Sequence, residues 1–321
     1  MTGKEWNAQP RFVVGLSTIW AAVLLVLPFT KITIDFAGFF PQIAVSLLLL
    51  ASGWFLGRRG QPGVRDFLNI LAGLPLVAIA LLSVNYIAMS FNMPLADEQL
   101  MRWDAALGFD WAAFIHFIDA RRWLSGPLMW AYESFLYQLC AVPLILFALG
   151  YRRRAQAFVI GFGVLTTASA FIAILFPAYG AYRTYGVPVG SLDNLNNHFG
   201  YFFIEQFEAV RTSESFMVTT DTLSGILTFP SVHAGVAYLV IWAIWPLKWL
   251  RIPGTALNVV MAISAIANAG HYLVDILASI PLTVACALLA REIFRTGEEV
   301  YLSAGMKNFT RPAASPASAS G

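Results

Sequence analysis

Eight long apolar runs constrain this 321-residue chain more than any other feature. Each approaches the roughly 20 helical residues needed to cross the hydrocarbon core of a bilayer. Hydrophobic residues make up 58% of the chain and charged residues 12%, which is about half the charged share of a soluble domain. We therefore expect an all-α integral membrane protein with about eight transmembrane helices. The predicted spans are Phe12–Phe29, Phe40–Leu56, Phe67–Ala88, Pro127–Leu149, Ala155–Phe176, Pro230–Leu247, Pro253–Gly270 and Tyr272–Ala290.

The basic residues predict the orientation of these spans. With the N-terminus in the cytoplasm, fourteen of the 20 Lys and Arg residues fall on the cytoplasmic side, as the positive-inside rule requires. We expect both termini to be cytoplasmic and, in a bacterium, the opposite face to be periplasmic. The first span lacks a cleavage site and is expected to be retained. The net charge of +2 reflects the cytoplasmic excess and does not indicate a nucleic-acid partner.

The segments between the spans differ in character. Residues 96–124 place aromatic residues at helical spacing among acidic ones, which predicts an amphipathic segment on the outer surface. The long connection 177–229 contains Gly200–Arg211, expected to be a short helix that lies on lipid or covers a site. Ser303–Gly321 consists largely of Ala, Ser and Pro and is expected to be a disordered tail. Cys140 and Cys286 lie inside spans and are interpreted as packing residues.

Two histidines mark the candidate site. His233 and His271 are joined by one predicted helical hairpin, so both lie at the same, outer membrane face. Asp275 follows His271 by four residues, and on a helix its carboxylate can accept a hydrogen bond from one ring nitrogen. The second nitrogen would then be free to act as a nucleophile, while His233 could protonate a leaving oxygen. Titratable groups in an apolar bundle are costly and indicate function, here on an outer-leaflet lipid headgroup.

These motifs make the chain recognisable. Pro230-Ser231-Val232-His233 followed by His271-x-x-x-Asp275 resembles the type 2 phosphatidic acid phosphatase (PAP2) superfamily. The forms Pro-Ser-Val-His-Ala-Gly and His-Tyr-Leu-Val-Asp resemble the branch of inositol phosphorylceramide and sphingomyelin synthases, and Leu107–Trp111 resembles bacterial members. The resemblance implies a catalytic membrane domain over residues 67–295, with a six-helix PAP2-like core. Residues 1–66 would then be two additional N-terminal helices and residues 296–321 the tail.

The resemblance also implies roles for individual residues. His271 would form a phosphohistidine, Asp275 would orient it, His233 would be the general acid, and Ser231 would help to hold phosphate; no metal or cofactor is implied. Two cationic positions of the phosphatases are occupied here by Phe176 and Ala265. Arg183 is then the best remaining phosphate ligand and Arg211 the next. Glu133 is expected either to recognise a polyol or alcohol acceptor or to form a buried structural hydrogen bond.

Three functions remain open at this stage. The missing cations favour an inositol phosphorylceramide synthase-like phosphotransferase that acts on a membrane lipid. The alternative is a PAP2-type phosphatase that hydrolyses phosphatidic acid or polyprenyl phosphate. A second alternative is a lipid carrier or transporter without catalysis.

Overall fold

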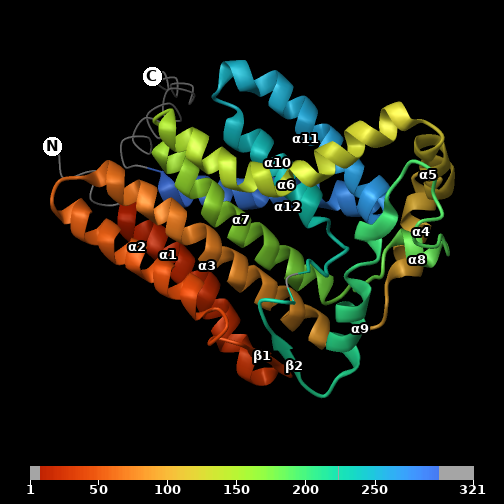
Figure 1. Ribbon diagram of the computed structural model, residues 1–321, viewed down its shortest axis with the longest axis horizontal. Coiled ribbons are helices and arrows are strands. Elements are labelled where there is room, and N and C mark those ends of the chain that lie inside the picture. Colours follow the sequence, from red (N-terminus) through yellow and green to blue (C-terminus); the bar gives the residue numbers. More distant parts are fainter. Residues whose placement is uncertain (1–7, 223, 296–321) are drawn as a thin grey trace, which may run out of the picture.

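The computed structural model describes residues 8–222 and 224–295, and it is built almost entirely of helices that run side by side (Figure 1). The tail expected after residue 296 lies outside the described residues. The elements are α1 (Ala8–Val26), η2 (Leu27–Phe29), β1 (Ile32–Ile34), α2 (Phe40–Arg58), α3 (Pro62–Ser90), α4 (Asp97–Ala106), α5 (Trp111–Asp119), α6 (Arg122–Ala148), α7 (Arg152–Ala173), α8 (Ala181–Thr184), η3 (Asn197–Gly200), α9 (Ile204–Thr212), β2 (Phe216–Val218), α10 (Val232–Ile244), α11 (Lys248–Ala269) and α12 (Leu273–Phe294).

The all-α membrane fold expected from the sequence is confirmed. Within the described residues, seven helices are long and apolar enough to span a membrane, namely α1, α2, α3, α6, α7, α11 and α12. The remaining predicted span, Pro230–Leu247, holds α10, which has only 13 residues and is about 20 Å long, too short to cross a hydrocarbon core of about 30 Å. Because α6, α7, α11 and α12 all pack against it, α10 does not have to match the thickness of the bilayer.

The first two helices pack on the outside of α3. α2 contacts α3, whereas α1 contacts both α3 and α7. Glycines allow this close approach of α1: a Cβ on Gly73 would lie 2.5 Å from Phe12, and one on Gly163 would lie 2.4 Å from Ile19. The parallel pair of β1 and β2 joins the α1–α2 connection to the segment that precedes α10.

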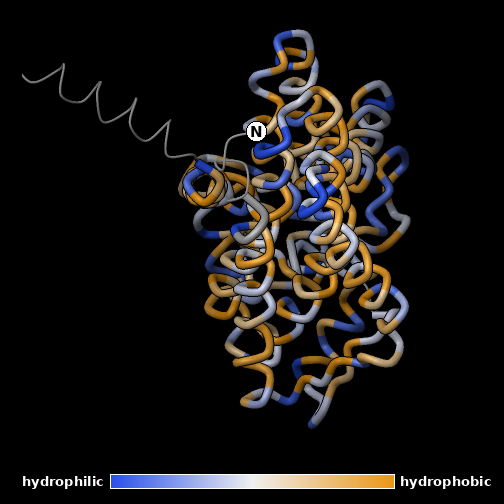
Figure 2. The backbone as a smooth tube through the Cα atoms, turned by 90° about the vertical axis from the view of Figure 1, so that its left-hand side faces the viewer, coloured by the Kyte–Doolittle hydropathy of each residue, from blue (hydrophilic) through white to orange (hydrophobic). Residues whose placement is uncertain are grey.

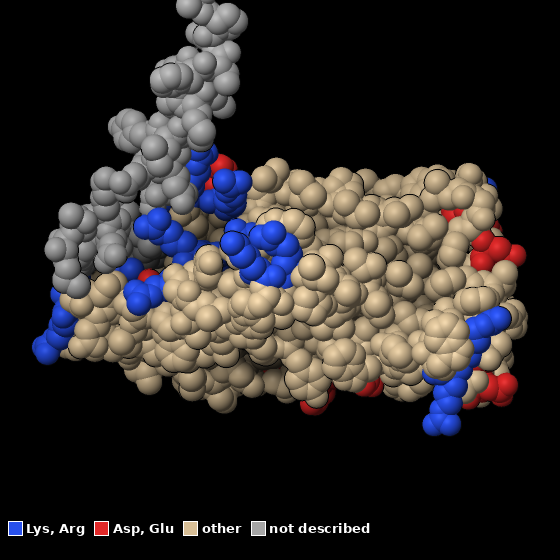
Figure 3. Space-filling view, turned by 90° about the horizontal axis from the view of Figure 1, so that it is seen from above, with Lys and Arg blue, Asp and Glu red and all other residues tan. Residues whose placement is uncertain are grey.

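The two ends of the bundle carry different charge. The tube in Figure 2 is mainly hydrophobic along the helices and hydrophilic near their ends. Lys and Arg gather at one end of the molecule, acidic residues are concentrated at the other, and the belt between them is almost uncharged (Figure 3). α4, α5, α8 and α9 lie at the end away from the termini (Figure 1). This polarity fits a multi-pass membrane protein.

The segment expected to lie on the outer surface is more deeply placed than the sequence indicated. Residues 96–124 form α4, α5 and the start of α6. Trp111 is fully buried, and Asp97 and Asp104 are 7% and 1% exposed. The helices form as the spacing predicts, but the carboxylates of Asp97 and Asp104 face the bundle because they accept hydrogen bonds from its backbone N–H groups.

The orientation can be tested with two exposed loop positions at opposite ends, in a variant whose native cysteines are replaced by alanine. Ser191→Cys and Gln61→Cys are both at exposed sites. We expect an impermeant maleimide added to intact cells to label position 191, and to label position 61 only after permeabilisation. Labelling of position 61 from outside would invert the predicted topology.

Candidate active site

His271 lies in the short connection between α11 and α12. α11 ends at Ala269, and Gly270 turns the chain with a φ of 70°, a left-handed conformation that favours glycine. A Cβ on Gly270 would also lie 2.6 Å from the ring of Tyr182. The backbone can therefore reverse direction only with glycine at this position, and the turn places His271 just before the first turn of α12.

Asp275 fixes the state of the His271 ring. His271 Nδ1 lies 2.9 Å from Asp275 Oδ2, which also accepts the N–H of Tyr272 at 2.9 Å. A carboxylate can only accept hydrogen bonds, so the ring proton resides on Nδ1 and the lone pair on Nε2. The contact expected from the four-residue spacing is present, although His271 precedes α12 and does not lie on it.

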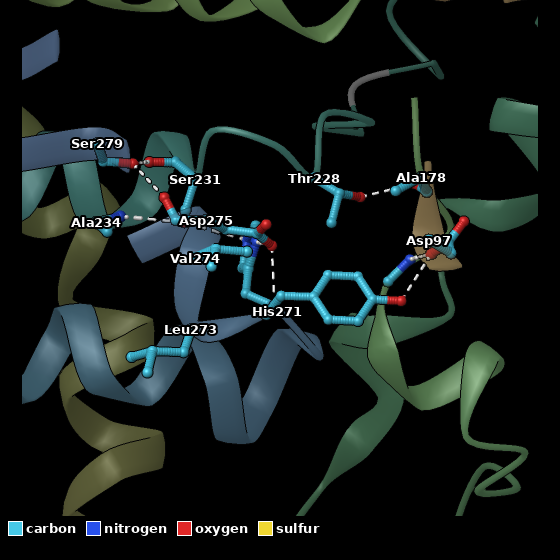
Figure 4. Close-up of polar contacts among 12 residues, drawn as sticks. Asp97, Ala178, Thr228, Ser231, Ala234, His271, Leu273, Val274, Asp275 and Ser279 are labelled. Atoms are coloured by element: carbon cyan, nitrogen blue, oxygen red, sulfur yellow. Dashed lines mark hydrogen bonds and ion pairs between the residues drawn. The ribbon is translucent and has the colours of Figure 1, made fainter. Parts of the chain in front are cut away.

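Ser231 connects the two sequence motifs. Its hydroxyl oxygen accepts the N–H of Ala234 at 3.3 Å and caps α10, as serine commonly does. The same oxygen lies 3.2 Å from His271 Nε2. Ser279 Oγ donates to the backbone carbonyls of Ser231 and Asp275, at 2.7 and 2.8 Å. These contacts hold the start of α10 against the first turns of α12 (Figure 4).

His233 lies in an aromatic sandwich one residue into α10. Its ring stacks on Tyr132 at 4.2 Å and on Phe135 at 4.1 Å, both from α6. The stacking fixes the plane of the ring, so the direction of its nitrogens is set before any ligand binds.

Both histidines line one cavity of about 300 Å³. Its walls come from α3, α6 and α7, from the segment 225–228, and from three phenylalanines of the long connection, Phe199, Phe202 and Phe203. The predicted covering segment, Gly200–Arg211, begins at the end of η3 and runs through the next turn into α9, and two of its aromatic residues, Phe202 and Phe203, line the cavity. None of the residues that line it is Lys or Arg. Among the residues that the structure describes, no group of three His, Cys, Asp or Glu side chains is arranged to hold a metal ion.

Two carboxylates of α4 hold the His271 segment from the other side. Asp104 accepts the N–H groups of Leu273 and Val274, each at 2.9 Å, and so caps α12. Burial raises the pKa of the Asp104 carboxyl above its ordinary value, although these two donors oppose the shift. Asp97 accepts the hydroxyl of Tyr272 at 2.9 Å, together with the N–H of Gly180 at 2.9 Å (Figure 4).

Sequence reasoning missed these residues. Asp97 and Asp104 lie seven residues apart, two helical turns, and therefore on one face of α4. That spacing was the available signal. Trp111 adds a further contact, because its Nε1 donates to the carbonyl of His271 at 3.2 Å. Asp97, Asp104 and Trp111 thus hold the His271 segment in place, and we refer to these three residues of α4 and α5 as the bracket.

The remaining predicted site residues lie away from the cavity lining. Arg183 pairs with Glu208 at 2.8 Å and lies over the ring of Tyr179. Arg211 donates to the carbonyl of Met93 at 2.8 Å. Glu133 is exposed on α6, so it does not form the buried structural hydrogen bond considered as one of its two roles. Ser231, by contrast, is buried and adjoins His271.

The bracket can be tested with a matched pair of aspartates. Asp104→Ala removes the acceptor for two N–H groups of α12 and should destabilise the protein by about 1–2 kcal/mol, with a loss of whatever activity depends on His271. Asp104→Asn, which keeps one acceptor oxygen, should lose less. Asp35→Ala removes a comparable acceptor away from the site, where Asp35 accepts the N–H of Gly38 at 3.0 Å before α2, and should leave activity intact. Thermal unfolding and turnover measure both effects; equal activity losses at positions 104 and 35 would refute a specific role for Asp104.

The comparison with known proteins agrees with this geometry. No curated protein and no solved structure matches the chain. A family model described as the PAP2 superfamily matches residues 98–289, a range that begins in α4 and ends in α12 and so contains both histidines, Asp275, Asp104 and Trp111, and that starts one residue after Asp97. Superfamily membership indicates a phosphatase or phosphotransferase that acts on phosphate esters. This chain belongs to the PAP2 superfamily.

Proposed function

We propose that the protein is a membrane phosphotransferase that takes a phosphate-containing headgroup from a lipid onto His271 and passes it to an alcohol. The observation that carries this proposal is the His271–Asp275 pair at 2.9 Å, which leaves Nε2 with its lone pair beside a cavity shared with His233. The proposal includes the predicted placement of the site at the outer, periplasmic face and a membrane lipid as the substrate.

In the first step Nε2 of His271 attacks phosphorus. A new N–P bond forms and the bond from phosphorus to the leaving oxygen breaks, with its electron pair going to that oxygen. His233 as the imidazolium donates a proton to the leaving oxygen, which departs as an alcohol. Asp275 stabilises the positive charge that develops on the His271 ring.

In the second step the phosphohistidine is resolved. Neutral His233 takes the proton of an acceptor hydroxyl while the acceptor oxygen attacks phosphorus. The N–P bond breaks and its electron pair returns to Nε2. An alcohol acceptor yields a new phospholipid or phosphate ester, whereas water yields a hydrolysis product.

The start of α10 supplies the phosphate contacts. Among the residues that the structure describes, the N–H groups of Val232 and His233 have no partner, and free N–H groups at a helix N-terminus bind anions. The Ser231 hydroxyl must donate to His271 Nε2 at rest, since that nitrogen carries no proton. We infer that it turns to a phosphate oxygen when the donor binds, which releases the lone pair for attack.

The charge of the cavity favours a diester donor. Phe176 and Ala265, at the two departures from the phosphatases, are apolar here: Phe176 packs on Phe229 and Trp103, and Ala265 is fully buried. A phosphodiester carries one negative charge, whereas a phosphomonoester approaches two near neutral pH. With no Lys or Arg among the residues that line the cavity, the monoanion is the easier ligand to bury. This preference supports the branch of inositol phosphorylceramide and sphingomyelin synthases.

Arg183, Arg211 and Glu133 are assigned to approach and recognition. Arg183 is about two-fifths exposed, and exchange of its Glu208 partner for a headgroup phosphate would keep a charge-assisted contact. Arg211 lies near the same group of residues, over the ring of Phe207. Glu133 adjoins Tyr132 of the cavity wall, and we propose that it meets a polyol or alcohol acceptor arriving along the outer face of α6.

The roles of the histidines can be separated by leaving group. His271→Ala should abolish turnover of every donor, because the covalent route needs the nucleophile. His233→Ala should slow natural lipid donors by about 10²–10⁴-fold, and an aryl phosphodiester with an acidic leaving phenol far less, since that oxygen leaves without a proton. Initial rates of purified variants give the comparison. Equal losses for both donors in His233→Ala would rule out the general acid role.

A comparison of donors and products distinguishes the three functions. Purified protein given a diester lipid and an alcohol acceptor should form new phospholipid faster than it releases phosphate from phosphatidic acid, as scored by lipid mass spectrometry and free phosphate. Faster hydrolysis of phosphatidic acid, with no acceptor product, would identify a phosphatase. No turnover of any donor, with lipid still bound, would identify a carrier.

A further inference from the structure

A hollow lined by basic side chains lies at the end of the bundle opposite the histidines. It has a volume of about 570 Å³ and lies where α7 begins and α10 and α12 end. Lys and Arg gather at this end of the molecule (Figure 3). Four arginines line the hollow together with two tryptophans, and the set is Arg153, Arg154, Arg291, Arg295, Trp242 and Trp245.

Two of these arginines are already engaged. Arg154 donates through Nε to the carbonyl of Ala243 at 2.8 Å and through Nη2 to that of Trp242, and its guanidinium lies 4.3 Å from the centre of the Trp242 ring. It therefore caps the C-terminal end of α10. Arg295 pairs with Glu292 at 3.0 Å.

The other two arginines are not engaged in this way within the described residues. Arg153 and Arg291 are exposed, and neither has an ion pair or hydrogen bond to any residue that the structure describes. Glu292 is the nearest acid along α12, and it is committed to Arg295. Several guanidinium groups around one hollow repel one another, so a bound anion would relieve their repulsion.

The arginine and tryptophan side chains around the hollow favour a phosphate ligand. The guanidinium fork binds phosphate oxygens in a bidentate manner, and tryptophans are favoured at the level of lipid headgroups. Trp245 is half exposed and would lie beside the glycerol and upper acyl chains. Basic hollows between membrane helices bind anionic headgroups in this way.

We propose that this hollow binds the phosphate of an acidic phospholipid. The positive-inside rule accounts for the number of basic residues at this end but not for four arginines around a single hollow. Arg58 and Arg59 show the contrast, because each lies over an aromatic ring of its own helix, Trp54 and Phe55. The hollow is separate from the active site, since the 18 helical steps from Leu273 to Arg291 on α12 span about 27 Å.

The test measures lipid binding, not turnover. Full-length protein in a neutral detergent is titrated with dioleoyl phosphatidylglycerol, dioleoyl phosphatidylcholine or inorganic phosphate, and bound ligand is counted by native mass spectrometry. Wild type should bind phosphatidylglycerol more tightly than either other ligand. Arg153→Gln with Arg291→Gln should weaken phosphatidylglycerol by about 25-fold, from about five-fold for each cation.

Arg58→Gln with Arg59→Gln is the matched control, with the same loss of charge at the same end of the bundle. It should change phosphatidylglycerol affinity less than two-fold. Equal losses in the two double variants would show a general charge effect and overturn the site. Equal binding of phosphatidylcholine would do the same, and inorganic phosphate bound as tightly as the lipid would show that the ligand is free phosphate.

Discussion

The hydrogen bond between His271 and Asp275 is the contact on which the site depends. This bond keeps the ring proton on Nδ1 only if the Asp275 carboxylate stays buried and the His271 ring cannot rotate. The surrounding structure meets both requirements. Asp275 is fully buried and its Oδ2 also accepts the N–H of Tyr272. Asp104 holds the first turn of α12, and the turn at Gly270 delivers His271 to the same place. A single pair of side chains thus rests on contacts from α4, α11 and α12.

The short helix α10 explains how polar chemistry is placed within an apolar bundle. A full-length span would put its N-terminus at the membrane surface, whereas the 13 residues of α10 begin beside the cavity. Phosphate binding, as proposed above, would satisfy the N–H groups of Val232 and His233, which have no partner among the described residues. The four helices that pack around α10 shield its sides from lipid. The length of α10 therefore does not have to match the bilayer, and its N-terminus can lie at the site.

The fold was largely predictable from the sequence because apolar runs report membrane helices directly. The family followed from two short motifs, and the contact between His271 and Asp275 followed from their spacing. The bracket of α4 was not predictable in the same way. Asp97 and Asp104 looked like acids on an amphipathic surface helix, and their partners are backbone N–H groups of residues about 80 to 170 positions away. Hydropathy carries no information about such contacts, and it equally could not show that Arg183 pairs with Glu208.

The proposed mechanism depends on a covalent bond between His271 and phosphorus, and peptide mapping detects that bond most directly. The protein is mixed with a diester donor labelled in its headgroup, quenched in alkali, where phosphohistidine survives, and digested for mass spectrometry. We expect the added mass of the phosphate-containing headgroup on His271 alone. His233→Ala supplied with an aryl donor should accumulate more of it, because the second step then lacks its base. A modification on any other residue, or none while turnover proceeds, would contradict the proposed mechanism.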